Sequence, residues 1–270
     1  MTSVLVLLPA LFALYLFLLM PRMGRRPHHS ALLGRYYTHR GLHDNAAGVP
    51  ENSMAAFRKS IEHGYGTEMD VQLTRDGIPV VFHDASLQRV CGVEGQVSDY
   101  TFEELQRFSL FGTEERIPRF ADFLALVDGQ VPIIVEIKAH GDFAAVCAAI
   151  APMLDSYKGP FCVESFHPMA VRWFKTHRPA WIRGQLSTNY NKPDQRQSAA
   201  QWTAQQLLVN VLSRPDFVAY DVRFFRNFSF RLCKTLFRPL SVAWTVKSQG
   251  QLEECRSTYD LFIFEGFVPE

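Results

Sequence analysis

The sequence predicts an α/β protein, a TIM (β/α)8 barrel preceded by a single N-terminal transmembrane helix. Three observations lead to this expectation. From Tyr36 onward, short β-rich runs alternate with helical patterns; eight such runs suit a parallel barrel; and 270 residues are enough for one barrel domain. The strands are expected at residues 36–40, 67–71, 132–138, 161–166, 181–187, 216–222, 240–246 and 260–264.

The first segment of the chain differs from the rest. Residues 3–20 contain no charged side chain and are about long enough to cross a bilayer at 1.5 Å per residue. No basic residue precedes the apolar run and no small-residue cleavage site follows it, which favours an uncleaved anchor over a signal peptide. Arg22, Arg25 and Arg26 follow directly. The positive-inside rule then predicts a single-pass membrane protein, anchored by residues 1–20, with its main domain on the cytoplasmic side.

Residues 21–35 form a basic stretch between the expected anchor and the barrel domain, which we place at 36–270. Such a linker is suited to lie against anionic lipid headgroups. Fully extended it would reach about 50 Å, so the tether does not set the orientation of the domain.

Helical patterns fill the intervals between most of the predicted strands. A ninth apolar run at 78–82 lies too close to 67–71 for a helical crossover, so it is expected to return as an antiparallel hairpin around the turn at 74–77. The helices are expected at 52–63, 101–127 in two pieces, 142–154, 168–176, 201–213, 227–237 and 248–256.

Composition excludes several classes of function. The 28 Lys and Arg residues nearly balance the 27 Asp and Glu residues, so net charge predicts no nucleic-acid partner. The five cysteines are widely spaced without a CxxC pair, which indicates reduced and mostly buried thiols. No P-loop, GxSxG or dinucleotide-binding motif occurs in a suitable context. The pattern does not predict an oligomeric state.

Acidic side chains interrupt two of the apolar strands. Glu68 and Asp70 are two residues apart and therefore point to one face, as do Glu136 and Lys138. Inside a barrel, two carboxylates repel each other and lose hydration, and a bound cation would resolve the conflict. One carboxylate facing solvent, or an internal salt bridge of Glu136 with Lys138, is the alternative. Three carboxylates without Cys or His suit Mg²⁺ or Ca²⁺ better than zinc.

Two histidines stand at predicted strand ends near these acids. His39 ends the first strand and His83 ends the hairpin, and imidazole can accept or donate a proton near neutral pH. Arg40 and Lys138 add fixed positive charge suited to phosphate contact. A cation site, two imidazoles and two basic side chains together indicate cleavage of a phosphoryl ester.

Several motifs, in this order, resemble those of the glycerophosphodiester phosphodiesterase family. The similarity covers roughly residues 36–266. The motifs are "HRG" (39–41), "PENS" (50–53), "EMDVQLTRDGIPVVFHD" (68–84), "LQRVCG" (87–92), "IPRFADFL" (117–124), "VEIK" (135–138), "ESF" (164–166) and "WTV" (244–246).

The resemblance implies metal-dependent hydrolysis of glycerophosphodiesters to glycerol 3-phosphate and an alcohol. By motif match it also implies roles for individual residues. Glu68, Asp70 and Glu136 would be the metal ligands, His39 and His83 the acid/base pair, Arg40 and Lys138 the phosphate contacts, and Glu51, Asn52 and Trp244 supporting residues. The chain departs from the family pattern at Ser53 (usually Thr), in "RVCG" (often "RTTG"), and in "FEGFVPE", where a Thr-Asp end is usual. These departures bear on substrate choice.

Two further segments leave alternatives open. Residues 216–239 interleave basic and phenylalanine side chains. They suit either an outer barrel helix that buries its phenylalanines, or a lip that touches anionic membrane lipid and admits lysophospholipids to a lysophospholipase D-like reaction. The polar stretch 187–201 follows a strand and suits a lid or a solvated insertion. A barrel that binds phospholipid headgroups without turnover is the non-enzymatic alternative.

Overall fold

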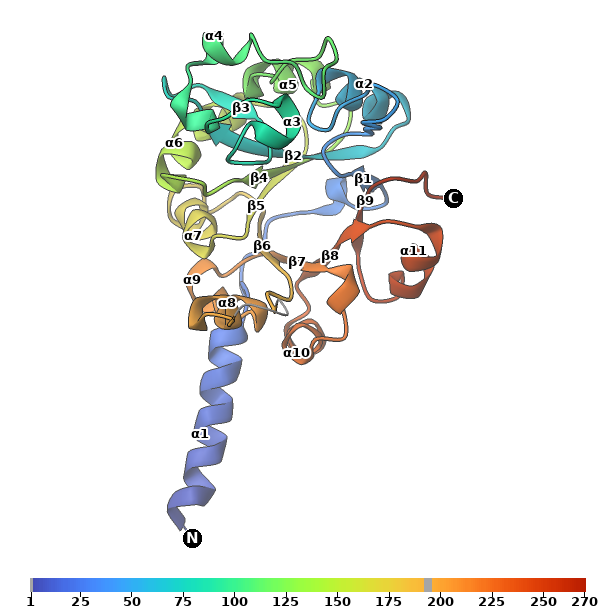
Figure 1. Ribbon diagram of the computed structural model, residues 1–270. Coiled ribbons are helices and arrows are strands. Elements are labelled where there is room, and N and C mark those ends of the chain that lie inside the picture. Colours follow the sequence, from blue (N-terminus) through green and yellow to red (C-terminus); the bar gives the residue numbers. More distant parts are fainter. Residues whose placement is uncertain (1, 192–195) are drawn as a thin grey trace.

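A closed parallel barrel forms the centre of the protein (Figure 1). The computed structural model describes residues 2–191 and 196–270, with side chains from residue 7 onward. Within these residues eight parallel strands pair in a ring that closes between β1 and β2. The predicted barrel is therefore confirmed. Its strands are β1 (Tyr36–Thr38), β2 (Gly66–Leu73), β4 (Ile133–Ile137), β5 (Phe161–Ser165), β6 (Arg183–Ser187), β7 (Phe217–Asp221), β8 (Leu240–Val246) and β9 (Leu261–Phe264).

A short hairpin extends from the carboxyl end of β2. Strand β3 (Pro79–Val81) pairs antiparallel with β2, with Val71 opposite Val81, as the chain spacing predicted. The chain then forms α3 (Gln88–Cys91), η2 (Val97–Asp99) and α4 (Phe102–Leu105), which bury a separate apolar cluster against the hairpin. Because residues 106–119 pack here as loop, the expected helical stretch 101–127 is reduced to α4 and α5 (Phe120–Val127).

The outer layer follows the predicted helices with one interruption. The helix expected at 201–213 is split, because Leu207 adopts a positive φ of 56° and buries its side chain completely. The helices of this layer are α2 (Met54–Glu62), α5, α6 (Phe143–Ser156), α7 (Pro168–His177), α8 (Ala199–Gln205), α9 (Asn210–Ser213), α10 (Phe228–Phe237) and α11 (Gln249–Cys255), with η3 (Val222–Phe224) following β7.

The core has two layers, as a barrel requires. Tyr37, Ile134 and Leu186 belong to an apolar cluster contributed largely by the barrel strands, while Phe57, Phe123 and Phe174 of the helices pack against the outside of the strands. Such burial supplies most of the folding free energy of an α/β domain. The five cysteines are free thiols and four of them are buried, as expected.

Helix α1 (Thr2–Leu19) extends away from the barrel, and its last turns pack between α9 and α10 (Figure 1). Tyr15 hydrogen-bonds Ser229 at 2.8 Å, and the Asn210 side chain donates to the carbonyl of Leu19 at 2.9 Å. Among the described residues, no helix has both the length and the apolar character needed to cross a membrane, so the predicted transmembrane helix is not supported.

The basic stretch that follows α1 lies against the amino end of the barrel. The Arg22 guanidinium donates to the carbonyl of Pro179 at 2.9 Å, and Arg26 donates to the carbonyl of Phe237 at 2.8 Å. Next comes η1 (Ser30–Leu32), where the Leu32 side chain is buried. Contacts along this segment therefore hold α1 in place relative to the barrel.

Candidate metal and phosphoester site

Three carboxylates meet at the carboxyl end of the barrel. Glu68 and Asp70 point inward from β2, and Glu136 points inward from β4; the strand register places Asp70 directly opposite Glu136. One oxygen from each of the three lies within 4.8 Å of the others, and all three residues are buried. The two-residue spacing read from the sequence thus places the acids on one face, and the parallel register brings the third beside them.

Two cations lie among these acids. The Lys138 ammonium is 2.7 Å from Glu136 Oε1 and 2.9 Å from Asp70 Oδ1. The Arg40 guanidinium is 2.7 Å from Glu51 Oε1 and 3.3 Å from Asp70 Oδ2. The salt bridge considered as an alternative for Glu136 and Lys138 is therefore present, but it neutralises only part of the acidic cluster.

Two loop residues between β1 and α2 have an unusual backbone conformation and hydrogen-bond to the acidic cluster. Arg40 and Asn52 have positive φ values of 56° and 55°, in a region that costs most residues free energy. The turn lets the Arg40 amide donate to Glu68 at 3.0 Å, while the Asn52 side chain donates to Asp70 at 2.8 Å. Ser53 stands where threonine is usual in the family that the motifs resemble, and its hydroxyl oxygen caps α2 by accepting a hydrogen bond from Ala56 N.

The charges at this site are not balanced by the protein groups. Burial, together with repulsion from Asp70 and Glu136, raises the pKa of Glu68 well above its usual value. Burial raises the pKa of Glu136 to about 7 in spite of Lys138. For Asp70, burial opposes ionisation, but Lys138 and Arg40 together lower its pKa below the ordinary range. Asp70 is thus a carboxylate at neutral pH. Glu68 and Glu136 have too little positive charge near them to stabilise their ionised forms fully.

The donor set fits a hard divalent cation. Among the described residues, Glu68 Oε1 and Asn52 Oδ1 are buried and accept no hydrogen bond. Buried polar atoms are normally paired, and oxygen atoms from carboxylates and an amide are the ligands that Mg²⁺ and Ca²⁺ take. A cation held by Glu68, Asp70 and Glu136 would satisfy Glu68 Oε1 and relieve the repulsion between the three carboxylates.

Both predicted histidines are oriented by a carboxylate. His39 Nδ1 is 2.7 Å from Glu265 Oε2, and His83 Nδ1 is 2.5 Å from Asp84 Oδ1. The hydrogen bond from His39 lowers the pKa of Glu265 to about 2, so the ionised carboxylate accepts a hydrogen bond from Nδ1–H and leaves Nε2 with its lone pair. Burial lowers the pKa of His39 to about 4 and also lowers that of His83, so both rings favour the neutral form.

Sequence reasoning missed four residues of this site. Glu265 and Asp84 orient the two histidines, and Arg89 joins Asp84 to Glu51 through contacts of 2.6 Å and 2.7 Å. Glu164 is buried on β5 opposite Glu136, with one oxygen unpaired within the described chain. The signals were present: Arg89 lies in "LQRVCG", Asp84 closes the longest motif, and Glu265 occupies the stretch noted only as a departure from the family pattern.

An open hollow of about 440 Å³ adjoins the site. Its lining includes His39, Arg40 and Glu51 from the site, together with Arg223 and Trp244. Trp244 packs edge-on against Phe166, with ring centroids 5.2 Å apart, and so gives the hollow an apolar wall. The possible lid at 187–201 includes residues 192–195, which lie outside the described residues.

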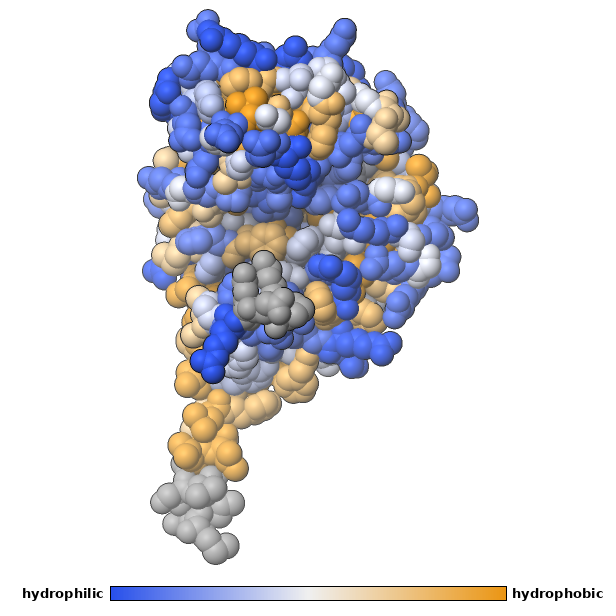
Figure 2. Space-filling model, viewed as in Figure 1, coloured by the Kyte–Doolittle hydropathy of each residue, from blue (hydrophilic) through white to orange (hydrophobic). Residues whose placement is uncertain are grey.

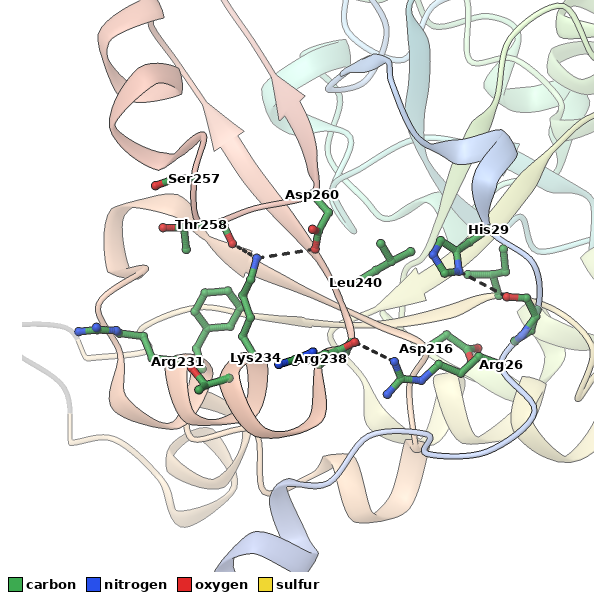
Figure 3. A pocket seen from close by; sticks show the side chains of 15 residues that line it. Arg26, His29, Asp216, Arg231, Lys234, Arg238, Leu240, Ser257, Thr258 and Asp260 are labelled. Carbon is green, nitrogen blue, oxygen red and sulfur yellow. Dashed lines mark hydrogen bonds and ion pairs between the residues drawn. The ribbon is translucent and has the colours of Figure 1, made fainter.

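A larger hollow lies at the opposite end of the barrel. Its volume is about 600 Å³, and its lining includes Ile182, Asp216 and Leu240 at the amino ends of strands, with Arg26 and Lys234 beside them (Figure 3). None of the residues predicted for the active site lines it. The volume of a hollow therefore does not identify the candidate site. The site is identified by the three carboxylates that meet there without enough neighbouring positive charge.

The fold and the acidic centre define a (β/α)8 barrel with three convergent carboxylates and two oriented imidazoles at its carboxyl end. The family model of the glycerophosphoryl diester phosphodiesterases matches residues 39–219. Since this match covers more than half of the chain, the protein belongs to the glycerophosphoryl diester phosphodiesterase family.

Individual relatives agree with this assignment over shorter stretches. A glycerophosphodiester phosphodiesterase of Caldanaerobacter subterraneus subsp. tengcongensis is 41% identical over 109 residues, 37% of this chain and 44% of that protein. The human glycerophosphodiester phosphodiesterase 1 is 31% identical over 110 residues, 37% of this chain and 32% of the relative. The matched stretch thus spans less than half the length of these curated relatives.

Solved structures show the same fold. An Oleispira antarctica phosphodiesterase in complex with the product sn-glycerol-3-phosphate superimposes with a TM-score of 0.70 at 22% identity, covering 86% of this chain and 93% of that one. A glycerophosphodiester phosphodiesterase from Thermotoga maritima gives a TM-score of 0.65 at 23% identity, with 88% and 96% covered.

Proposed function

We propose that this protein hydrolyses glycerophosphodiesters to glycerol 3-phosphate and an alcohol, with Mg²⁺ or Ca²⁺ held by Glu68, Asp70 and Glu136. The observation that carries the proposal is the meeting of these three buried carboxylates within 4.8 Å, beside two imidazoles whose Nδ1 atoms are each held by a carboxylate. A purely structural acidic cluster has no need of two oriented imidazoles. The product seen in the Oleispira antarctica relative is consistent with this reaction.

When bound, the cation supplies Lewis-acid polarisation of a phosphoryl oxygen and offsets the charge that develops there. The protein's own cations assist. Arg40 and Lys138 stay protonated, because for each of them the pull of Asp70 and its neighbouring acids outweighs the effect of burial and raises the pKa. They hold fixed positive charge where a phosphodiester would bind.

The two histidines divide the proton transfers. His39 is the general base in this proposal, because its pKa of about 4 keeps Nε2 free to accept a proton from the attacking hydroxyl. That hydroxyl belongs either to water or to the neighbouring glycerol carbon, which would first form a cyclic phosphate. His83 is the general acid: its side chain is more exposed, 31% against 15%, so it can take up a proton from solvent, although burial lowers its pKa and Asp70 offsets that effect only in part. It donates a proton to the leaving alcohol oxygen.

The test is release of glycerol 3-phosphate from glycerophosphocholine. The purified chain should release it with Mg²⁺ or Ca²⁺, should lose the activity in chelator, and should regain it when the metal is restored. Release of phosphocholine in place of glycerol 3-phosphate would contradict the assigned bond cleavage. Binding of glycerophosphocholine without any product would favour the headgroup-binding alternative.

Acyl-bearing lysophospholipids are a second candidate substrate. The observation in their favour is the Trp244 ring, packed against Phe166, in the lining of a hollow that also includes Arg223. A lysophospholipase D-like reaction would release lysophosphatidic acid and the same alcohol. Comparing kcat/KM for glycerophosphocholine and lysophosphatidylcholine in one detergent decides between them, because indifference to the acyl chain argues against lipid as the preferred substrate.

We also propose that α1 attaches the protein to membrane lipid, with the barrel on the cytoplasmic side. The support is the solvent-exposed apolar surface of α1, where Leu7, Leu8 and Phe12 are each more than half exposed, followed by Arg22, Arg25 and Arg26. Protease added to intact cells should leave the barrel uncut and should digest it after the cells are opened. Cleavage in intact cells would place the domain outside.

A further inference from the structure

The edge of the domain beside α1 has an unusual distribution of charge. Residues 196–239 contain seven cationic side chains and only two acids, Asp216 and Asp221. Both acids are buried, and both are paired with arginines, Asp221 with Arg223 at 2.6 Å. The solvent-facing part of this stretch therefore presents cations without exposed carboxylates of its own.

The cationic side chains at α10 differ in whether they have hydrogen-bond or ion-pair partners. The Lys234 ammonium donates a hydrogen bond to Ser241 and forms an ion pair with Asp260. The adjacent Arg26 donates to the backbone carbonyls at the end of α10 (Figure 3). Arg231 and Arg238 are exposed, and neither side chain has an ion pair or hydrogen bond to the described residues. These two guanidinium groups are thus available to an external anion.

Large apolar side chains accompany these cations. Trp202 on α8 is 50% exposed, and Phe228 and Leu236 on α10 are 68% and 49% exposed. Apolar surface continues from the exposed part of α1 onto the domain around its base (Figure 2). Of the two alternatives for 216–239, a barrel helix that buries its phenylalanines describes Phe230, which is buried, whereas Phe228 at the start of the same helix is exposed.

We propose that this edge docks on an anionic membrane surface alongside α1. We define the docking edge as Trp202, Phe228, Arg231, Leu236 and Arg238. Aromatic and apolar side chains next to unpaired arginines match the interface of a bilayer with anionic headgroups, and the nearby Asp260 is already paired with Lys234. Each cation at such a surface strengthens attachment about fivefold. A second copy of this chain would meet the same uncompensated positive charge and be repelled.

Docking has a consequence for the active site. Arg223 lies in η3, between β7 and α10, and it lines the hollow that contains His39 and Arg40. The segment η3 therefore connects the hollow to the start of α10, where Phe228 of the docking edge lies, whereas Arg231 and Arg238 line the hollow at the amino end. If the proposed hydrolysis is right, the docked enzyme draws its phosphodiester from the membrane surface.

The experiment measures contact of Trp202 with lipid in the full-length protein. The chain is reconstituted on vesicles with brominated acyl chains, either phosphatidylcholine alone or an equal mixture with phosphatidylglycerol, and quenching of tryptophan fluorescence is recorded. The protein should be quenched more strongly on the anionic vesicles, and Trp202→Phe should lose most of that quenching. The remaining tryptophans, Trp173, Trp181 and Trp244, are less exposed than Trp202 and serve as the internal reference.

The contribution of the two arginines to binding of anionic vesicles is measured with the double variant Arg231→Gln/Arg238→Gln. Its matched control is Arg58→Gln/Arg107→Gln, two exposed arginines on α2 and after α4, at the other end of the molecule from α1 (Figure 1). The docking variant should lose quenching on anionic vesicles and not on neutral ones, and the control should keep it. Equal behaviour of the two variants, or full quenching in Trp202→Phe, overturns the proposal. So does a wild-type protein that is unquenched and dimeric by light scattering, which assigns the edge to a second copy.

Hydrolysis of water-soluble glycerophosphocholine is followed in parallel and should be equal in all variants. If none of them hydrolyses it while the quenching pattern holds, the proposed function fails and the docking edge stands. If hydrolysis is normal but the expected differences in quenching are absent, the docking proposal is wrong and the proposed function stands.

Discussion

The two ends of the barrel contain charged hollows, of about 440 Å³ at the carboxyl end and about 600 Å³ at the amino end, that differ in how their charges are paired. At the amino end, Lys234 and Arg26 are bound to hydroxyl, carboxylate and backbone carbonyl groups, so their hydrogen bonds stabilise the fold. At the carboxyl end, three carboxylates outnumber the cations that reach them, and buried oxygens of Glu68 and Asn52 remain without donors. The candidate site is thus marked by convergent carboxylates that outnumber the neighbouring cations, and not by the volume of its hollow.

The largest effect expected from this difference is on the histidines. His39→Ala or His83→Ala should lower kcat for glycerophosphocholine about 10²- to 10⁴-fold, since each removes a proton-transfer group. KM should change far less, because Arg40 and Lys138 remain to bind phosphate. Steady-state kinetics check this, and turnover equal to the wild type in either variant would remove that histidine from the mechanism.

A smaller loss is expected at the residue that orients His39. Glu265→Gln should lower kcat about 10- to 100-fold, because an amide can no longer accept strongly from Nδ1 and the ring loses its fixed tautomer. Glu253→Gln on the exposed face of α11 is the matched control and should have no effect. Glu265→Asp should recover part of the rate. A merely structural role would instead show as lower thermal stability with unchanged kcat.

The acidic end should also show pH-dependent cation binding. Burial raises the pKa of Glu136 to about 7, so in the metal-free protein this carboxyl is protonated below that pH and must release its proton to bind a cation. Affinity for Mg²⁺ or Ca²⁺ should therefore rise between about pH 6 and pH 8, by up to about tenfold per pH unit for each proton released. Calorimetry in buffers of different ionisation enthalpy measures the released protons. Affinity that is flat or falls over this range would contradict the charge balance described above.

The smallest catalytic effect is expected at the amino end. Lys234→Gln should change kcat less than about twofold while lowering the free energy of unfolding by about 1 kcal/mol, through loss of its hydrogen bonds to Ser241 and Thr258. Denaturant unfolding together with kinetics separates the two quantities. A large loss of activity with normal stability would show that the amino-end hollow takes part in the reaction.

Much of the candidate site could be predicted because it depends on local spacing. Glu68 and Asp70 share a face in any strand, and the short interval to residues 78–82 requires a hairpin that returns His83 toward them. The residues missed depend on distant pairing. Glu265 is 226 positions from His39, and Arg89 reaches Glu51 across 38 residues, so no local pattern indicates either contact.

The same distinction applies to the fold. Alternation of β-rich and helical runs predicted the number and order of the barrel strands, because each run must bury an apolar face. It did not predict that Leu207 would divide one helix or that residues 106–119 would form loop, since these depend on where neighbouring elements leave space. Residue order along the chain thus determines which side chains share a face. The closed barrel alone decides which of those faces meet, because Asp70 and Glu136 become neighbours only through the register of two strands far apart in the sequence.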